Sequence, residues 1–301
     1  MSHDGHRRPA RVSPAKATGK LFVVGTPIGN LEDITLRAIR TLKEVDVIAC
    51  EDTRRTQQLL DHYSIPTQTV SYHQHNEMTR APELIIQMEE GSHIALVSDA
   101  GMPGISDPGY RLVHLAIRHE IPVTPVPGVS AFVAAISASG LPVDKFRFLG
   151  FLPSKKSARR KSLEGLRSAA KALIFYEAPH RLVEMLEDVL EVLGDRPAVV
   201  AREVTKVHEA FMRGPISEVL QALKKKPVRG EITVLLGTAA AEQPKVLPAQ
   251  SIRKELEGVM AGQGLDEREA LKVVARRRGI SKSEAYRQWQ TEKGRAPRSL
   301  S

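Results

Sequence analysis

Three loops rich in glycine, proline and small residues follow apolar runs and have the composition of ligand-binding loops. They are Gly25–Asn30 (GTPIGN), Asp99–Gly109 (DAGMPGISDPG) and Pro127–Phe132 (PGVSAF). Such loops expose backbone N–H and C=O groups in a fixed shape, and the third places small residues where a helix begins and its first N–H groups lack partners. Each alone could be a structural turn. Together they indicate a crevice for a cofactor recognised by its polar edges, such as an adenine or an amino-acid moiety.

The spacing within the first loop excludes two common nucleotide sites. Gly25–Asn30 has neither the G-x-G-x-x-G pattern of a Rossmann dinucleotide site nor the G-x-x-x-x-G-K-[ST] pattern of a P-loop. A metal site is conceivable at His73 and His75, which we expect on one face of a strand with Glu77 nearby. Two histidines without a cysteine partner are a weak signature, so we predict no metal.

The elements that must position these loops alternate between strands and helices. This alternation is typical of an α/β fold with a largely parallel sheet, in which ligands bind beyond the carboxyl ends of the strands. The sequence predicts two α/β domains, 20–128 and 129–240, joined near 127–141. The strands are expected at 21–25, 45–50, 67–72, 93–98, 122–126, 146–151, 172–177, 198–203 and 231–237, with helices in the second series at 155–168, at 180–193 and from Pro215 to Leu223.

The 301 residues carry a formal net charge of +9, and this charge is concentrated in three segments. Residues 1–20 hold five Lys/Arg and one acid, 153–171 hold seven and one, and 245–301 hold thirteen and seven. Clustered Lys/Arg neutralise phosphates, so three clusters favour a large polyanionic partner, although any one could be a solvated face. The single cysteine, Cys50, excludes an internal disulfide and favours the cytoplasm.

The ends of the chain differ from its body. We expect residues 1–19 to be a disordered basic arm and 248–301 to be a basic helical extension. Residues 267–289 predict a helix, a turn at Gly279 and a second helix that Ser281 could cap, a helix-turn-helix pattern that would suit RNA or a plain packing appendage. The uncharged stretch 121–143 contains four prolines, so we expect no membrane partner.

Seven motifs in order connect these features to a known family. They read VVGTPIGNLEDITLRA, CEDTRRT, YHQHNE, SDAGMPGISDPG, PGVSAF, FYEAPHR and AREVTKVHE. Over about residues 21–237 the chain resembles the tetrapyrrole methylase superfamily, and more closely its bacterial branch that methylates a cytidine 2′-hydroxyl in the decoding region of 16S ribosomal RNA. The resemblance implies a homodimer of two-domain α/β subunits with S-adenosylmethionine in the cleft between domains. Members acting on tetrapyrroles show G-x-G-P-G-D where this sequence has GTPIGN, which makes a tetrapyrrole substrate doubtful.

The resemblance also assigns roles to individual residues. Carried over by position, the residues expected at the cofactor are Ile28, Asp99, Ala100, Gly101, Met102, Ile105, Ser130, Ala131, Tyr176 and Thr233. A cleft-side basic run is expected to grip phosphates near the target nucleotide, and two arginines of the extension to add affinity for RNA. These residues are Lys155, Lys156, Arg159, Arg160 and Lys161, with Arg276 and Arg277.

Methyl transfer to a ribose hydroxyl depends on aligning oxygen, methyl and sulfur, and a base that removes the hydroxyl proton assists it. Our first candidate for this base is Glu177, with His180 beside it and Arg181 placed to hold a phosphate. Other charged residues just beyond predicted strands stay open as alternatives: Glu51, Asp52, Glu203 and Lys206.

Three functions compete for this pattern. A 2′-O-methyltransferase acting on 16S ribosomal RNA or on a small-subunit particle explains the loops and the charge together. A tetrapyrrole C-methyltransferase of the same fold leaves the basic extension unexplained. A non-catalytic RNA-binding module for ribosome assembly leaves the glycine-rich loops without a purpose. We therefore predict the first function.

Overall fold

The computed structural model describes residues 18–226, 228–238, 251–278 and 280–293. The expected N-terminal arm up to residue 17, the segment 239–250 and Gly279 lie outside these ranges. The chain divides into two compact units, residues 1–239 and 240–301. The larger unit contains both sheets, and the smaller unit contains three helices.

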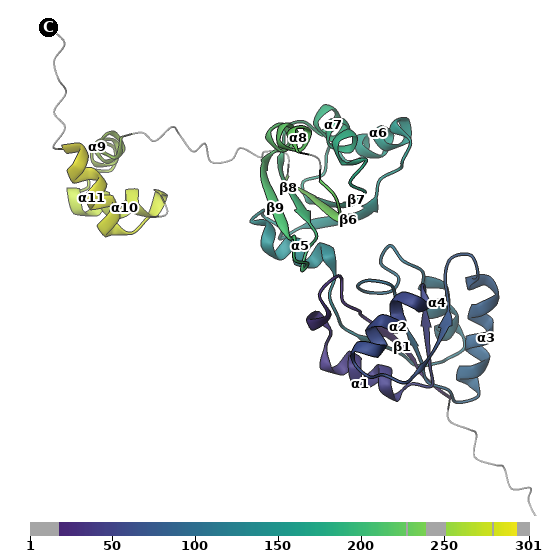
Figure 1. Cartoon of the computed structure of the whole chain (residues 1–301). Helices are drawn as coiled ribbons and strands as arrows, with labels where there is room; N and C mark the ends of the chain where they lie inside the picture. The colour runs from purple at the N-terminus through teal and green to yellow at the C-terminus, as the bar shows by residue number, and fades with distance from the viewer. Residues whose placement is uncertain (1–17, 227, 239–250, 279, 294–301) are drawn as a thin grey trace, which may run out of the picture. The chain divides into compact units, whose positions relative to one another are not determined.

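The first half of the larger unit is a five-stranded sheet whose strands all run parallel, with helices on both faces (Figure 1). Its order is β3-β2-β4-β1-β5, and all five strands predicted for this half are present. Its elements are β1 (Leu21–Val24), the 3₁₀ helix η1 (Leu31–Asp33), α1 (Leu36–Glu44), β2 (Val47–Cys50), α2 (Thr53–His62), β3 (Gln68–Ser71), α3 (Glu77–Glu89), β4 (Ile94–Leu96), α4 (Tyr110–Arg118) and β5 (Val123–Val126).

Strand β4 shows why the sequence forms a sheet that is buried on both sides. Successive side chains of a strand point to opposite faces. Ile94 and Leu96 pack into a core with residues of α3 and α4, whereas Ala95 and Val97 pack into another core with residues of α1 and α2. A continuous apolar run is therefore required, as is usual for a parallel strand in the middle of a sheet.

The second half of the larger unit is a mixed sheet in the order β6-β7-β10-β8-β9. β6 and β7 run parallel, and the other neighbouring pairs run antiparallel. The four predicted strands are present, but β9 was not predicted because its sequence, AFMRGP, combines an arginine, a glycine and a proline at a half-exposed edge. The elements are α5 (Ala131–Ser139), β6 (Phe146–Phe151), α6 (Lys156–Glu164), β7 (Ala172–Glu177), α7 (Leu182–Leu193), β8 (Pro197–Arg202), β9 (Ala210–Pro215), α8 (Ile216–Lys225) and β10 (Ile232–Leu236).

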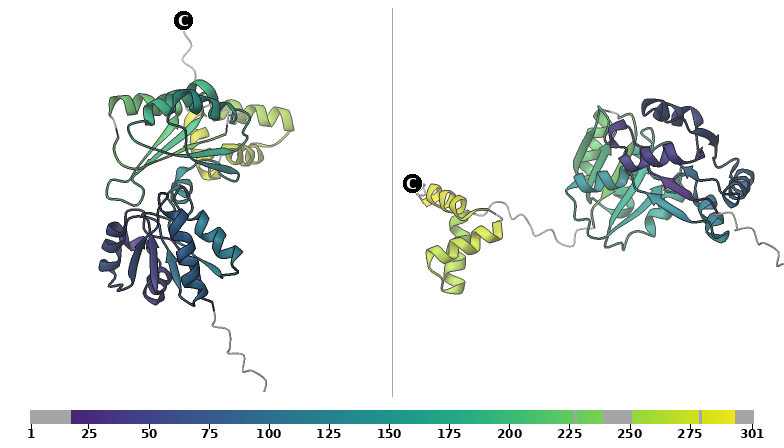
Figure 2. Two further views of the ribbon diagram at one scale, coloured as in Figure 1. Left: turned by 90° about the vertical axis from the view of Figure 1, so that its right-hand side faces the viewer. Right: turned by 90° about the horizontal axis from the view of Figure 1, so that it is seen from below.

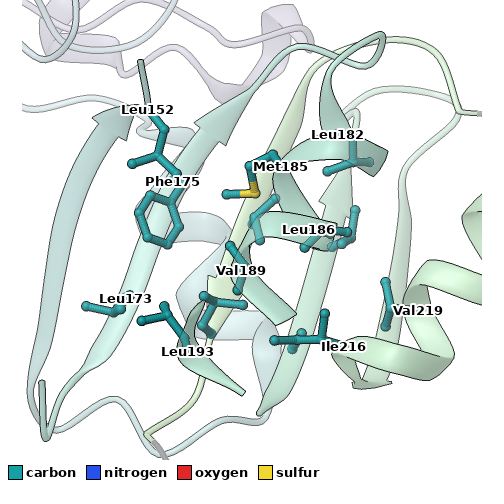
Figure 3. Close-up of a cluster of buried hydrophobic side chains, with 14 of the residues drawn as sticks. Leu152, Leu173, Phe175, Leu182, Met185, Leu186, Val189, Leu193, Ile216 and Val219 are labelled. Carbon is teal, nitrogen blue, oxygen red and sulfur yellow. The ribbon is translucent and has the colours of Figure 1, made fainter. Parts of the chain in front are cut away.

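Helix α7 forms the centre of the core on one face of this sheet. Its Met185, Leu186 and Val189 point toward the strands, where they meet Phe175 and Leu173 of β7 (Figure 3). The spacing of these apolar residues places them on one side of a helix. Helix α5 covers the opposite face, so the second half is also a helix–sheet–helix sandwich. The α/β prediction is confirmed, although the second sheet is less parallel than expected.

The smaller unit packs three helices on one another (Figures 1 and 2). They are α9 (Ile252–Gln263), α10 (Glu267–Arg278) and α11 (Lys282–Lys293), and their shared core includes Leu271, Val274 and Trp289. The two helices predicted around the turn are present as α10 and α11, and α9 completes the bundle. Within the described ranges, the chain has no helix long and apolar enough to cross a bilayer.

Candidate active site

A cavity of about 400 Å³ lies in the larger unit, beside the loops that follow β1 and β4. This is the edge where parallel sheets commonly bind ligands, and the volume suits a nucleoside-sized molecule. The rest of the wall comes from the start of α5, from strands β6, β7 and β10 with their adjoining residues, and from the loop after β8. The lining residues are Ile28, Ala100, Gly101, Met102, Ile105, Ser106, Asp107, Ser130, Ala131, Phe151, Tyr176, Glu177, Ala178, Pro179, Val204, Gly230, Glu231, Ile232 and Thr233.

Backbone contacts hold the three glycine-rich loops together. Thr26 and Gly101 exchange two hydrogen bonds, with N···O distances of 2.9 and 3.1 Å, and the Thr26 hydroxyl donates to the Ser98 carbonyl at 3.1 Å. A Cβ on Gly25 would lie 2.7 Å from the Cα of Gly128. Gly101 has a φ of +83°, which side chains disfavour. These glycines therefore do more than allow the chain to turn: Gly25 lets two loops pack closely, and Gly101 adopts a backbone conformation that other residues disfavour.

The loop after β8 carries backbone strain next to the first glycine-rich loop. Glu203 and Thr205 adopt φ values of +50° and +71°, a conformation that costs on the order of 1 kcal/mol per residue outside glycine. The Lys206 ammonium lies 3.0 Å from Glu203 and 3.2 Å from Glu231, and its aliphatic stem covers Gly29. Two alternatives for the base, Glu203 and Lys206, are thus paired with each other.

The structure gathers nine of the ten residues expected at the cofactor around this one cavity. The exception is Asp99. Its carboxylate accepts the Asp52 N–H at 3.0 Å and the Arg55 Nη1 at 3.2 Å. Asp99 therefore fastens the start of α2 to the end of β4 and does not line the cavity.

The three residues predicted for catalysis lie in different surroundings. Glu177 lines the cavity, but its buried carboxylate accepts the Ala178 N–H at 2.8 Å and lies 3.4 Å from the Arg181 Nε. Arg181 does not line the cavity, and its Nη2 donates to the Leu152 carbonyl at 3.0 Å. His180 is exposed and also lies outside the lining. Glu177 is thus held by partners in its own segment, an arrangement that suits a positioning role better than proton transfer.

Asp107 was not predicted from the sequence, although it also lines the cavity. Burial, assisted by the nearby carboxylates of Glu51 and Asp99, raises the pKa of Asp107 to about 6, and the Ser98 side chain partly offsets this rise. A carboxylate that titrates near neutrality is suited to acid–base chemistry. The available signal was a second aspartate, framed by glycines and prolines, in the loop that follows β4.

The sequence and the fold of this chain both resemble those of known proteins. A family model of the Tetrapyrrole (Corrin/Porphyrin) Methylases matches residues 20–220. The chain belongs to this family. The crystal structure of the methyltransferase CobJ superposes with a TM-score of 0.57 at 22% identity, covering 74% of this chain and 95% of that one. Uroporphyrin-III C-methyl transferase from Thermus thermophilus, complexed with S-adenosyl homocysteine, superposes with a TM-score of 0.52 at 23% identity, covering 73% and 97%. At such identities the likeness establishes the fold alone.

Within the tetrapyrrole methylases, the chain groups with proteins named ribosomal RNA small subunit methyltransferase I. The relative from Halalkalibacterium halodurans is 48% identical, covering 89% of this chain and 93% of its own length. The relative from Micromonospora olivasterospora is 44% identical, covering 92% and 88%. The relative from Thermotoga maritima is 50% identical over 218 residues, which are 72% of this chain and 98% of that protein.

The basic run of this tetrapyrrole methylase divides into two groups. Lys155, Lys156 and Lys161 are exposed, and in the described part of the chain none of them makes an ion pair. Arg159 is buried with an exposed fraction of 1%, so the expectation that it grips a phosphate does not hold. Arg160 is partly buried and pairs with acids of α7. The sequence places five basic residues within seven positions, but helix periodicity directs one of them, Arg159, into the core.

The structure also gives the positions of two further groups of residues that the sequence singled out. Arg276 and Arg277 are exposed at the end of α10, whereas the next arginine, Arg278, lies 2.7 Å from Glu255 of α9. His73 and His75 follow β3 in the loop before α3, so the prediction that they share one face of a strand is wrong. The described ranges contain no group of three His, Cys, Asp or Glu residues arranged to hold a metal ion.

Proposed function

We propose that this chain transfers a methyl group from S-adenosylmethionine to the ribose 2′-hydroxyl of a cytidine in the decoding region of 16S ribosomal RNA. The observation that carries the proposal is its identity of 44–48%, over about nine-tenths of the chain, to proteins named ribosomal RNA small subunit methyltransferase I. In this proposal the cavity binds the cofactor, and the exposed basic residues contact the RNA.

The cavity fits the cofactor in size and chemistry. Its walls include the apolar residues Ile28, Met102 and Val204 and the polar residues Ser130 and Thr233. Apolar walls with a few fixed polar groups are the usual recognition surface for an adenosine or amino-acid moiety. S-adenosylmethionine supplies an activated methyl group on a sulfonium, and the loops need only hold it in line with the acceptor oxygen.

We assign direct contacts with the cofactor to the nine lining residues of the expected set. Asp99 acts indirectly. Its hydrogen bonds to Asp52 and Arg55 hold the loop after β4 against the start of α2, and they thereby fix the position of the neighbouring Ala100. The buried Glu177 and the partly exposed Arg181 act as a pair that holds the EAPHR segment at the rim, with His180 exposed toward solvent. These roles concern binding and positioning of the substrate ribose.

We propose that the RNA lies across the side of the larger unit that carries Lys155, Lys156 and Lys161, with Arg160 partly available. Exposed lysines gain affinity by releasing counterions from phosphates. Phe151 lines the cavity and has 57% of its surface exposed, which offers a flat apolar platform beside the cofactor site. A base from an unpaired strand could stack there while its ribose faces the cavity. Arg276 and Arg277 add a second contact from the extension.

We further propose that the enzyme is a cytoplasmic homodimer with two α/β domains, 20–128 and 129–240, and a basic extension from 248 onward. The dimer rests on the family resemblance. Light scattering coupled to size exclusion tests it directly: a mass near twice 33.1 kDa is expected, and a monomer at micromolar concentration contradicts it.

The test of the proposed function offers three acceptors to the purified protein with methyl-labelled S-adenosylmethionine. Naked 16S ribosomal RNA, small-subunit particles and a uroporphyrinogen-type tetrapyrrole are compared under the same conditions. Label in either RNA sample supports the proposal, and the comparison of the two identifies the acceptor. Label in the tetrapyrrole alone establishes the alternative enzyme. Cofactor binding by calorimetry without label in any acceptor points to a binding module.

A further inference from the structure

Asp107 occupies a fixed position in the cavity wall. Its loop closes on itself, because a Cβ on Gly109 would lie only 3.1 Å from the backbone nitrogen of Gly104. Ser106, the residue before it, has a φ of +64°, and Gly104 has a φ of +80°. Strained backbone of this kind persists where surrounding structure imposes it, and it is concentrated at functional sites. The carboxylate is thus presented at the cavity by a loop with little freedom.

The charged groups around Asp107 come from several elements. Glu51 follows β2 and Asp99 follows β4, and both act on Asp107 as like charges. Tyr176 of β7 lies near enough for its own ionisation to be affected by Asp107. Arg55 is paired with Asp99, from whose Oδ2 its Nη1 lies 3.2 Å away.

His73 completes these surroundings, because it acts electrostatically on Glu51. In the described residues no Lys, Arg or His forms an ion pair with Asp107. A half-buried carboxylate without a cation partner, facing two other carboxylates, holds a proton more readily than an ordinary aspartate.

Three acids line the cavity: Asp107, Glu177 and Glu231, and Glu231 is paired with Lys206 at 3.2 Å. Glu177 has a cation, Arg181, and an N–H donor, Ala178, on its carboxylate. These partners already occupy lone pairs of the carboxylate that would otherwise receive a proton. Asp107 has no cation partner in the described part of the chain; its carboxylate has the Ser98 side chain as a hydrogen-bond partner, and the residue lines the cavity.

We propose that Asp107 is the proton acceptor for the attacking 2′-hydroxyl, an inference that rests on the proposed function and names the residue that assists it. The O–H bond of the ribose breaks, and its proton goes to a carboxylate oxygen of Asp107. The ribose oxygen forms a bond to the transferred methyl carbon while the bond from that carbon to sulfur breaks, its electron pair remaining on sulfur. The positive charge of the sulfonium is thereby neutralised, and the step needs no further reagent.

The first test measures the Asp107 pKa without any reaction. Free energies of unfolding are compared between the full-length protein and Asp107→Asn from pH 4 to pH 8. Because the folded-state pKa of Asp107 is raised, ionisation penalises the folded wild type as pH climbs from about 4 to above 6. We expect equal stability near pH 4 and a more stable Asp107→Asn near pH 8. Glu90→Gln, at the exposed end of α3, removes the same charge and controls for net charge. A pH-independent difference overturns the proposal.

The second test measures turnover with the acceptor that the wild type methylates. Asp107→Asn should lower kcat by about a hundredfold or more while cofactor affinity by calorimetry changes less than about threefold. Glu177→Gln is run beside it. Near-normal turnover in Asp107→Asn, with loss in Glu177→Gln, assigns the base to Glu177 and overturns the proposal. A wild type that methylates no RNA instead refutes the proposed function, and the stability test still reports on Asp107.

A third variant keeps the proposal testable if Asp107→Asn does not fold. Glu51→Gln removes a like charge facing Asp107, so the acid limb of the wild-type pH–rate profile should move to lower pH by about half a unit. An acid limb that stays in place contradicts the assignment. Complete loss of turnover in Glu51→Gln at every pH transfers the role of base to Glu51.

Discussion

Arg159 of α6 and Asp188 of α7 form a buried ion pair in which Nε donates to Oδ2 at 2.7 Å. The two side chains are 1% and 3% exposed. Arg159 Nη1 also donates to the Ser154 carbonyl at 3.2 Å, so the guanidinium ties the start of α6 to α7. An arginine in a basic run is here a core residue, and removal of either charge leaves the other buried.

Arg159→Leu should therefore destabilise the protein by roughly 3 kcal/mol, because the Asp188 carboxylate remains in the interior with only Arg160 beside it. Denaturant unfolding measures this. The double variant Arg159→Leu with Asp188→Leu should recover a large part of the loss, since no unpaired charge remains. A single variant as stable as the wild type but weaker in RNA binding would restore Arg159 to the RNA surface.

Charge reversal of Lys155 and Lys156 should weaken RNA binding and flatten its salt dependence. Each contact with single-stranded phosphate contributes about 0.7 to the slope of log K against log salt, so the double change removes about 1.4. Lys225→Glu with Lys226→Glu, at the end of α8, makes the same change in net charge. Equal slopes for both double variants would show that only total charge matters.

Gly25→Ala should lower the affinity for S-adenosylmethionine by at least about tenfold. An added Cβ would lie 2.7 Å from both the Gly128 Cα and the Met102 sulfur, so the first and third loops must separate. A displacement of this order in a positioning loop is costly. Calorimetry measures the affinity. Gly258→Ala, in α9 with no atom near the added Cβ, is the control and should keep it; unchanged affinity in both variants would contradict the loop contact.

Truncation after Thr238 should leave cofactor affinity unchanged and weaken RNA binding. The cavity is built entirely from the larger unit. The Thermotoga maritima relative matches over 98% of its length with only 218 residues, so a protein with that name exists at about the length of this unit. Calorimetry and an RNA binding titration measure the two effects. Loss of cofactor binding on truncation would place the extension in the site.

Much of this fold could be read from the sequence because apolar runs and turn residues coincide with the buried strands. β4 is a continuous apolar run and β10 is apolar except for Thr233, and both are buried along their length. β9 could not be read in this way, since an edge strand pairs on one side only and tolerates Arg213 and Gly214. The second sheet is largely antiparallel because β10 runs antiparallel to both of its neighbours, β7 and β8, and β9 runs antiparallel to β8.

The glycine-rich loops of the site could be predicted from the sequence, whereas the surroundings of its charged residues could not. Glycine-rich loops predict positions where the backbone packs closely or adopts a positive φ. Gly25 packs closely against Gly128, and Gly101 has a positive φ. Burial and partners of a charged side chain depend on tertiary packing, which local sequence does not encode. The sequence therefore predicted Arg159 as a phosphate ligand, although its side chain is buried. The proximity of Asp107 to Glu51 and Asp99 arises only in the folded protein, where the loops after β2 and β4 lie together.

The central claim is most directly tested by the identity of the methylated nucleoside. 16S ribosomal RNA or small-subunit particles lacking the modification are incubated with the protein and S-adenosylmethionine, then digested to nucleosides and analysed by mass spectrometry. We predict a single new product, cytidine carrying the methyl group on its 2′-oxygen. A methyl group on a base, on another nucleoside or on no nucleoside at all would contradict the proposed function.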